Sequence, residues 1–229
     1  MKHVAQTGAL LLALIVANGA SAQETQRIVV TPYAGVFIPS SSVAEVPLDI
    51  GGRLGLAGIE QQAGLATGIT ASYSFNNFAG IELSGAWAFS DVKVSPVLAA
   101  RIPGFAERHE SARVVIGAAK LMFNLLPINR RAALRLGVGP AIISRGGSAF
   151  KADDRGDFDG VTDVGGAISL CTRLPLSDFL AVRLRAENFM YASRLRYRDF
   201  SGSSETFTFD SQVQNDLIFS AGLQMVWWR

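Results

Sequence analysis

The length and spacing of eight β-like segments constrain the fold of this chain more than any other feature. Each segment is rich in Val, Ile, Leu, Phe and Gly and is long enough for a tilted membrane strand, which needs about 9–11 residues. Strands of ordinary globular sheets are shorter, at about 5–6 residues. The predicted strands are Arg27–Ile38, Ala63–Phe75, Phe78–Ser90, Ala112–Leu126, Ala132–Ile143, Asp163–Arg173, Phe179–Ala192 and Val213–Trp228.

The connections between these segments alternate between short and long. Short turns at Asn76–Asn77, Pro127–Arg131 and Leu174–Asp178 carry the residue types that turns favour. The long polar connections are Pro39–Gln62, Asp91–Ser111, Ser144–Thr162 and Ser193–Gln212. This asymmetry predicts an eight-stranded antiparallel up-and-down transmembrane β-barrel with long outer loops and short periplasmic turns. A ten-stranded version, in which Leu48–Ile59 adds a hairpin, stays open but would break the alternation.

Side chains along most predicted strands alternate between apolar and polar. In the third segment Ile81 and Leu83 share one face and Glu82 lies on the other, whereas the first segment shows no clean alternation. A charge on the lipid face near the midplane costs about 2–4 kcal/mol, so the strand charges are expected to face the lumen. The predicted lumen charges are Glu82, Lys120, Arg135, Arg183, Arg185 and Glu187.

The lumen of an eight-stranded barrel is just wide enough for side chains to fill it. Because an uncompensated buried charge is costly, we expect Glu82 and Glu187 to lie among the four cations in an ion-pair network that forms a structural core. The alternative is a narrow, mildly anion-selective path, since four cations face two anions. Cys171, on the inner face of the sixth strand, is predicted to be an inert packed thiol.

Aromatic residues cluster near the predicted turn ends, where membrane barrels place a ring of aromatics at the boundary between lipid and water. The predicted interface aromatics are Phe75, Phe78, Phe123, Phe179, Trp227 and Trp228. A soluble β-sandwich or lipocalin-like barrel is the competing fold, but it would need outward charges, shorter strands and less regular loops.

The N-terminus predicts export. Lys2 precedes an apolar run from Ala9 to Ala17, and Ala20–Ala22 supplies the small-x-small pattern of a signal-peptidase site, so residues 1–22 are the predicted signal peptide and 23–229 the barrel domain. Without Lys2, the 21 basic side chains become 20, against 19 acidic ones. A nearly neutral chain argues against nucleic-acid binding. After the signal, the apolar runs are too short for a membrane-spanning helix.

With these features in place, the chain resembles the small outer-membrane β-barrel family, which includes the membrane domain of OmpA and the OmpX-like proteins. Phe219–Arg229 is similar to the last-strand signal that the barrel-assembly machinery recognises, although Arg229 follows the usual final aromatic position. The resemblance implies a bacterial outer-membrane location, contact with membrane lipid and lipopolysaccharide, and insertion by that machinery. A monomer with no cofactor is expected.

The sequence offers few candidates for chemistry, and no catalytic or metal-binding residues are predicted. Some small outer-membrane barrels are enzymes that use histidine, and here His109 lies beside Glu107, Glu110 and Ser111. A triad is recognised by geometry, however, and a solvated loop histidine is the preferred interpretation.

The third long connection holds Asp153, Asp154, Asp157 and Asp159, but their spacing does not match an EF-hand loop. Arg155–Asp157 also spells an integrin-recognition tripeptide, which occurs easily by chance. The leading hypothesis is a non-enzymatic outer-membrane protein that supports the envelope or contacts its surroundings through four outer loops. A small porin-like channel and a lipid-modifying enzyme that uses His109 are the alternatives.

Overall fold

The structure is a computed structural model that describes residues 28–39, 42–50, 53–94, 109–125, 133–150, 156–159, 161–177, 180–199, 206–208 and 212–225. The predicted signal peptide and the predicted interface residues Phe179, Trp227 and Trp228 lie outside these ranges. In the described part of the chain, no helix has both the length and the apolar character needed to cross a membrane.

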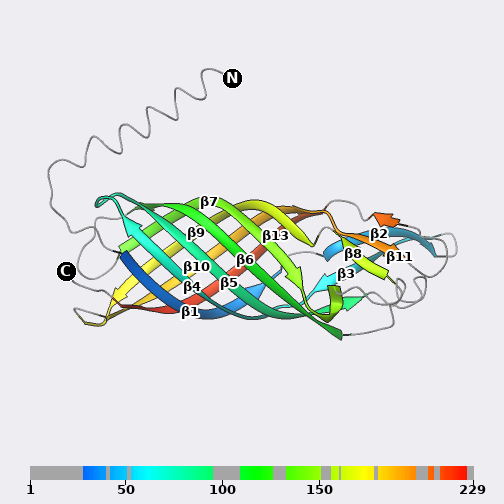
Figure 1. Cartoon of the computed structure of the whole chain (residues 1–229), viewed down its shortest axis with the longest axis horizontal. Coiled ribbons are helices and arrows are strands. Elements are labelled where there is room, and N and C mark those ends of the chain that lie inside the picture. The colour runs from blue at the N-terminus through cyan, green and yellow to red at the C-terminus, as the bar shows by residue number, and fades with distance from the viewer. Residues whose placement is uncertain are drawn as a thin grey trace, which may run out of the picture.

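Eight long antiparallel strands close into a barrel (Figure 1). They are β1 (Ile28–Ile38), β4 (Gly64–Ser74), β5 (Ala79–Val94), β6 (His109–Asn124), β7 (Ala133–Gly146), β9 (Thr162–Pro175), β10 (Leu180–Ser193) and β13 (Gln212–Met225). Each pairs with the next, and β13 returns to β1, where Val30 lies opposite Met225. The predicted eight-stranded up-and-down barrel is confirmed.

The strand ends that the short connections join lie together at one end of the barrel, which we call the turn end. The start of β1 lies there too, since Ile28 pairs with Tyr73 at the end of β4. In the β4–β5 turn, the Asn76 side-chain oxygen accepts hydrogen bonds from the backbone N–H groups of Phe78 and Ala79, each at 2.8 Å. An asparagine that bonds to its own turn in this way explains why the reversal needs so few residues.

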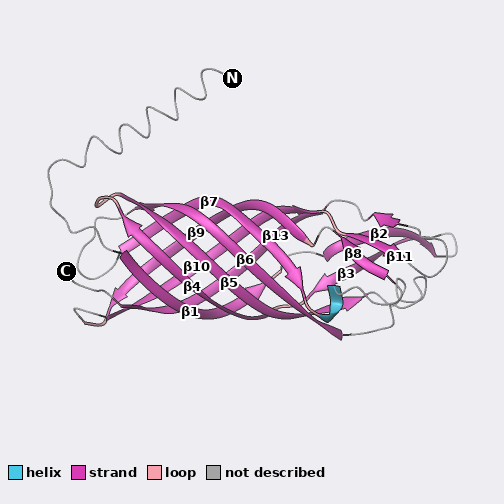
Figure 2. Ribbon diagram, viewed as in Figure 1, coloured by secondary structure: helices cyan, strands magenta, loops and turns pink. Residues whose placement is uncertain are grey.

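Additional strands extend the structure beyond the opposite end, which we call the loop end (Figure 2). A hairpin of β2 (Ser42–Ile50) and β3 (Arg53–Gln61) pairs with the last residues of β5 through Ile59–Gln61. A separate three-stranded sheet contains β8 (Gly156–Asp159), β11 (Arg196–Asp199) and β12 (Thr206–Thr208). The hairpin considered for a ten-stranded version therefore exists, but it lengthens the wall above β4 and does not enter the ring of eight.

The outer surface of the ring is apolar. Four large apolar side chains are each more than half exposed, although such side chains are usually buried in soluble proteins. They are Leu65, Leu83, Phe89 and Ile142. From Ile81 to Phe89, the outward positions of β5 span about 20 Å of barrel height for a tilted strand, close to the apolar band of membrane barrels. Such a surface is suited to lipid.

The interior is filled by side chains in layers. An apolar layer includes Phe37, Ile116, Ile143, Phe189 and Ile218, each at most 2% exposed. Along the strands, this layer separates one polar cluster nearer the turn end from another nearer the loop end. Strand β1 also alternates, but its inward residues include the large aromatics Tyr33 and Phe37. Polarity alone therefore could not separate its two faces.

Candidate functional site in the barrel lumen

Glu82 is the centre of a buried charge cluster near the turn end. One carboxylate oxygen, Oε1, lies 3.2 Å from the Lys120 ammonium and 3.2 Å from a guanidinium nitrogen of Arg185. The other oxygen, Oε2, accepts a hydrogen bond from the Ser72 hydroxyl at 2.9 Å and pairs with Arg183. Three cations and a hydroxyl thus surround one carboxylate that has no exposed surface.

Glu187 supplies the second carboxylate of this turn-end cluster. It pairs with Lys120, and its Oε2 lies 3.6 Å from Nε of Arg185. The structure therefore brings five of the six predicted lumen charges into one network. Strand alternation placed these residues on the inner face, and the cross-strand register sets Glu82 directly opposite Lys120.

An aromatic ring lies beside this network. The Arg185 guanidinium lies over the Tyr33 ring, 4.2 Å from its centroid, which is a cation–π contact. The Tyr33 hydroxyl donates a hydrogen bond to the Gly85 carbonyl at 3.2 Å. The ring reaches β5 across Gly68 of β4, where a Cβ would lie 2.4 Å from the ring. Glycine at position 68 therefore leaves the space that the Tyr33 ring occupies.

Arg135 shares the inner face but takes no part in the network. No ion pair joins it to a carboxylate of the described residues, and its buried Nε has no hydrogen-bond partner there. Its strand position is opposite Cys171, the free cysteine, which is 2% exposed. The Cys171 sulfur accepts a hydrogen bond at 3.0 Å from Arg183, and Arg183 also donates to the Ser72 hydroxyl at 3.2 Å.

A second charge cluster, nearer the loop end, was missed by sequence reasoning. Arg145 donates at 2.7 Å to Asp163 and at 2.7 Å to the Tyr191 hydroxyl, which in turn donates to Asp216. The predicted strand ended at Ile143, which assigned Arg145 to a loop. Strand β7 continues to Gly146, so alternation turns Arg145 inward. Extending the predicted strand by three residues, to Gly146, would have placed Arg145 on the same face as Ile143 and so predicted that it points into the lumen.

Solved structures with the same architecture decide the fold family. The outer membrane protein AlkL, solved in DMPC lipid bilayers, aligns at a TM-score of 0.63 and 14% identity, covering 91% of this chain and 94% of AlkL. The outer membrane protein OprG from Pseudomonas aeruginosa aligns at 0.60 and 12%, covering 90% and 97%. The fold is that of the small outer-membrane β-barrels.

A third solved barrel, Neisserial surface protein A, aligns at a TM-score of 0.52 and 10% identity, covering 87% of this chain and 97% of that one. No family model matches the chain, and no curated protein sequence matches it. The fold and the apolar exterior together indicate a location in the outer membrane, as for these solved structures. At these identities the likeness concerns the fold, and the role of this outer-membrane barrel has to be argued from its own residues.

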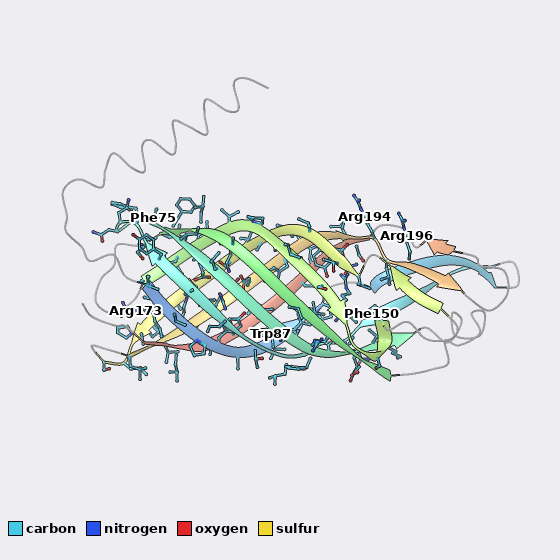
Figure 3. The ribbon with its side chains drawn as sticks, viewed as in Figure 1. Phe75, Trp87, Phe150, Arg173, Arg194 and Arg196 are labelled. Carbon is cyan, nitrogen blue, oxygen red and sulfur yellow. The ribbon has the colours of Figure 1, made fainter. Side chains whose placement is uncertain are left out.

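Three of the predicted interface aromatics are described. Phe75 and Phe78 lie at the β4–β5 turn with 46% and 72% of their surface exposed, and Phe123 is half-buried. Tyr73 and Phe75 stack edge to face, with ring centroids 5.5 Å apart. Figure 3 places Phe75 at the turn end of the barrel and Arg194 at the loop end.

The remaining candidates do not assemble into a site in the described residues. His109, Glu110 and Ser111 are the first three residues of β6. Glu107 lies outside the described ranges, as do Asp153 and Asp154. Asp157 and Asp159 occupy β8, opposite Arg198 and Arg196 of β11. In the described ranges, no group of three potential metal-ligating side chains occurs.

Proposed function

We propose that this outer-membrane barrel has a non-enzymatic role in which the lumen is a structural core and the outer loops make the functional contacts. The observation that carries the proposal is the pairing of Glu82 with Arg183 and Arg185. Strands β5 and β10 stand on opposite walls, since three strands separate them on either side of the ring. Side chains that meet across the diameter leave no room for a water column at that level.

The layers above the turn-end cluster support the same proposal. Toward the loop end, the next layer is the apolar one around Phe37, Phe189 and Ile218. The Arg145–Asp163 ion pair lies beyond that layer. Charges that pair with one another in a packed interior are part of a core, whereas charges that conduct ions remain open to water.

The loop end supports a role in surface contacts. The β2–β3 hairpin continues the wall beyond the membrane-facing band, and the β8–β11–β12 sheet adds a second ordered element there (Figure 1). Loops that a rigid scaffold positions are where binding function is commonly found. We further propose a monomer that contacts lipopolysaccharide and that the barrel-assembly machinery inserts.

Single-channel recording in a planar bilayer tests the structural-core proposal. Correctly folded protein should give no conductance above background. Discrete, salt-dependent openings that disappear in Arg183→Gln or Arg185→Gln would overturn the proposal and favour a narrow anion-selective pore instead. Arg194→Gln is the matched control, because Arg194 is exposed at the loop end and faces away from the lumen.

Thiol labelling gives an independent test. The sequence has one cysteine, and Cys171 is buried beside Arg183. A charged maleimide should leave Cys171 unmodified in the folded barrel and react after unfolding. Ser177→Cys in a Cys171→Ser background is the positive control, since Ser177 is exposed in the β9–β10 turn. Rapid labelling of folded wild-type protein would reveal a water path to the lumen.

The enzyme alternative has its own test. His109→Ala should leave the lipid A of expressing cells unchanged in mass, as wild-type expression itself should. A lipid A modification that appears with the wild-type protein and vanishes with His109→Ala would contradict the non-enzymatic role.

A further inference from the structure

The apolar outer band ends at paired positions of two neighbouring strands, β5 and β6. On β5, the outward side chains change from apolar to charged between Phe89 and Asp91. On β6, the residue opposite Phe89 is Arg113, and the residue opposite Asp91 is Ser111. Membrane barrels change from apolar to polar side chains at the boundary between lipid and water. This face of the barrel therefore crosses that boundary, on the loop-end side, at Phe89 and Arg113.

An open groove with a volume of about 670 Å³ lies at this boundary. Its lining includes Phe89 and Asp91 of β5, Ser111 and Arg113 of β6, and Ser148 in the connection after β7, and we call it the rim groove. The Arg113 side chain is exposed, and no ion pair joins it to a carboxylate of the described residues, Asp91 included. Its guanidinium can therefore be reached from outside the barrel.

One wall of the rim groove is held in place by the connection after β7. The Ser148 hydroxyl lies 3.0 Å from the Ser111 hydroxyl and also donates to the Ser111 carbonyl at 3.4 Å. Gly147 precedes it with a φ of 112°, which favours glycine, and a Cβ there would lie 2.4 Å from the same carbonyl oxygen. The connection therefore packs against the start of β6 and leaves two exposed hydroxyls in the groove.

Large aromatic side chains lie on the membrane side of the rim groove. Phe89 is 55% exposed, and Trp87, two positions toward the turn end on the same face of β5, is 44% exposed. Figure 3 places Trp87 on the barrel wall and Phe150 near the loop end. Aromatic rings of this kind sit where lipid headgroups meet the hydrocarbon region. The groove thus combines a cation and two hydroxyls with an apolar surface below them.

We propose that the rim groove binds the phosphorylated headgroup of lipid A, with Arg113 donating to a phosphate and with Phe89 and Trp87 in contact with acyl chains. A guanidinium presents two parallel N–H groups that match phosphate oxygens. A free phosphate would use Arg113 but not the aromatic rings, so the two kinds of surface together favour a lipid. The inference rests on the proposed function, in which the loop end faces outward and the barrel contacts lipopolysaccharide, and it names the site of that contact.

Native mass spectrometry of the detergent-refolded protein tests the site, with purified lipid A as the probe. Bis-phosphorylated lipid A should bind at least tenfold tighter than the same lipid without its phosphates. Arg113→Gln should remove that difference, and Arg113→Lys should keep part of it, since the charge remains but the paired donors are lost. Asp91→Asn should bind the phosphorylated lipid more tightly, because a carboxylate in the groove repels phosphate. Arg194→Gln is the matched control and should bind like wild type, because Arg194 is exposed at the loop end outside the groove lining.

The outcomes separate this site from the wider proposal. Equal losses in Arg113→Gln and Arg194→Gln would indicate a diffuse attraction to anionic lipid and would overturn the rim groove. Displacement of lipid A by an equal concentration of inorganic phosphate would also overturn it, because the aromatic rings would then contribute nothing. If lipid A binds wild type and Arg113→Gln equally, the groove fails and the contact with lipopolysaccharide stands. If no form of lipid A binds, both fail, while conductance decides the structural core independently.

Chemical modification of the wild-type protein gives a result that does not depend on how the variants fold. Phenylglyoxal modifies accessible guanidinium groups, and mass spectrometry locates the products. Bis-phosphorylated lipid A should slow modification of Arg113 several-fold and leave Arg194 unaffected. Equal rates at Arg113 with and without lipid A would contradict binding at the rim groove.

Discussion

Glu82 and Arg183 form an ion pair across the full width of the barrel, from strands that stand on opposite walls. Neighbouring strands are already joined by their backbone hydrogen bonds, so a pair between adjacent strands adds little to the shape of the ring. A pair across the diameter is different because it fixes the distance between two walls that share no backbone contact. The turn-end cluster therefore connects opposite walls of the barrel directly.

Replacing Glu82 with Gln should destabilise the barrel strongly. The substitution leaves Arg183 and Arg185 with Glu187 as the one remaining carboxylate of the cluster, and breaking a buried pair by removing one partner costs about 3–5 kcal/mol. The midpoint of urea unfolding in detergent measures the loss. Asp91→Asn, an exposed acid on the same strand, is the control and should unfold like wild type. An unchanged midpoint for Glu82→Gln would show that the pair contributes nothing.

Adding one methyl group at Gly68 should also destabilise the protein. The new Cβ would lie 2.4 Å from the Tyr33 ring and 2.3 Å from the Gly85 carbonyl, so the ring and the strand have to shift. Overpacking of this kind costs about 1–3 kcal/mol. Gly85→Ala is the matched control, because its Cβ would meet nothing within 4 Å. In a Tyr33→Ala background, Gly68→Ala should cost less, and an equal cost in both backgrounds would contradict the role of the ring.

The sequence predicted the ring of strands because its signals are local. Alternation predicted an inner-face position for Glu82, Lys120 and Arg185, and all three side chains are buried. Alternation could not predict that Glu82 pairs with Arg183. It assigns each side chain to the inner or the outer face, but it does not show which inner residues meet across the lumen. The sequence also did not predict that β5 extends to Val94, because this extension depends on pairing with the β2–β3 hairpin, which is distant in sequence.

A charge on the outer face should be tolerated according to its depth. Leu83 is 55% exposed within the apolar band, so Leu83→Arg should cost about 2–4 kcal/mol, whereas Asp91→Arg near the loop end should cost about 0–1 kcal/mol. Folding into lipid vesicles, followed by gel mobility and urea titration, measures both. Similar costs for the two variants would place the apolar band at a different height on the barrel.

The two charge clusters should contribute independently to stability. Arg145→Gln removes the partner of Asp163 and should destabilise the barrel, but the apolar layer separates this pair from Glu82. The costs of Glu82→Gln and Arg145→Gln should add within about 0.5 kcal/mol. Glu82→Gln and Arg183→Gln share a contact, so their double variant should be more stable than the sum predicts. Strong coupling between Glu82 and Arg145 would show that the layers act as one unit.

The seam between β1 and β13 also has a consequence for biogenesis. Val30 pairs with Met225, so the ring joins the first strand of the chain to the last. Contacts between such distant segments make folding slow. The ring cannot close before β13 is present. Closure requires the free edge of β1 to meet β13, so a ligand that covers this edge should block the last step of assembly.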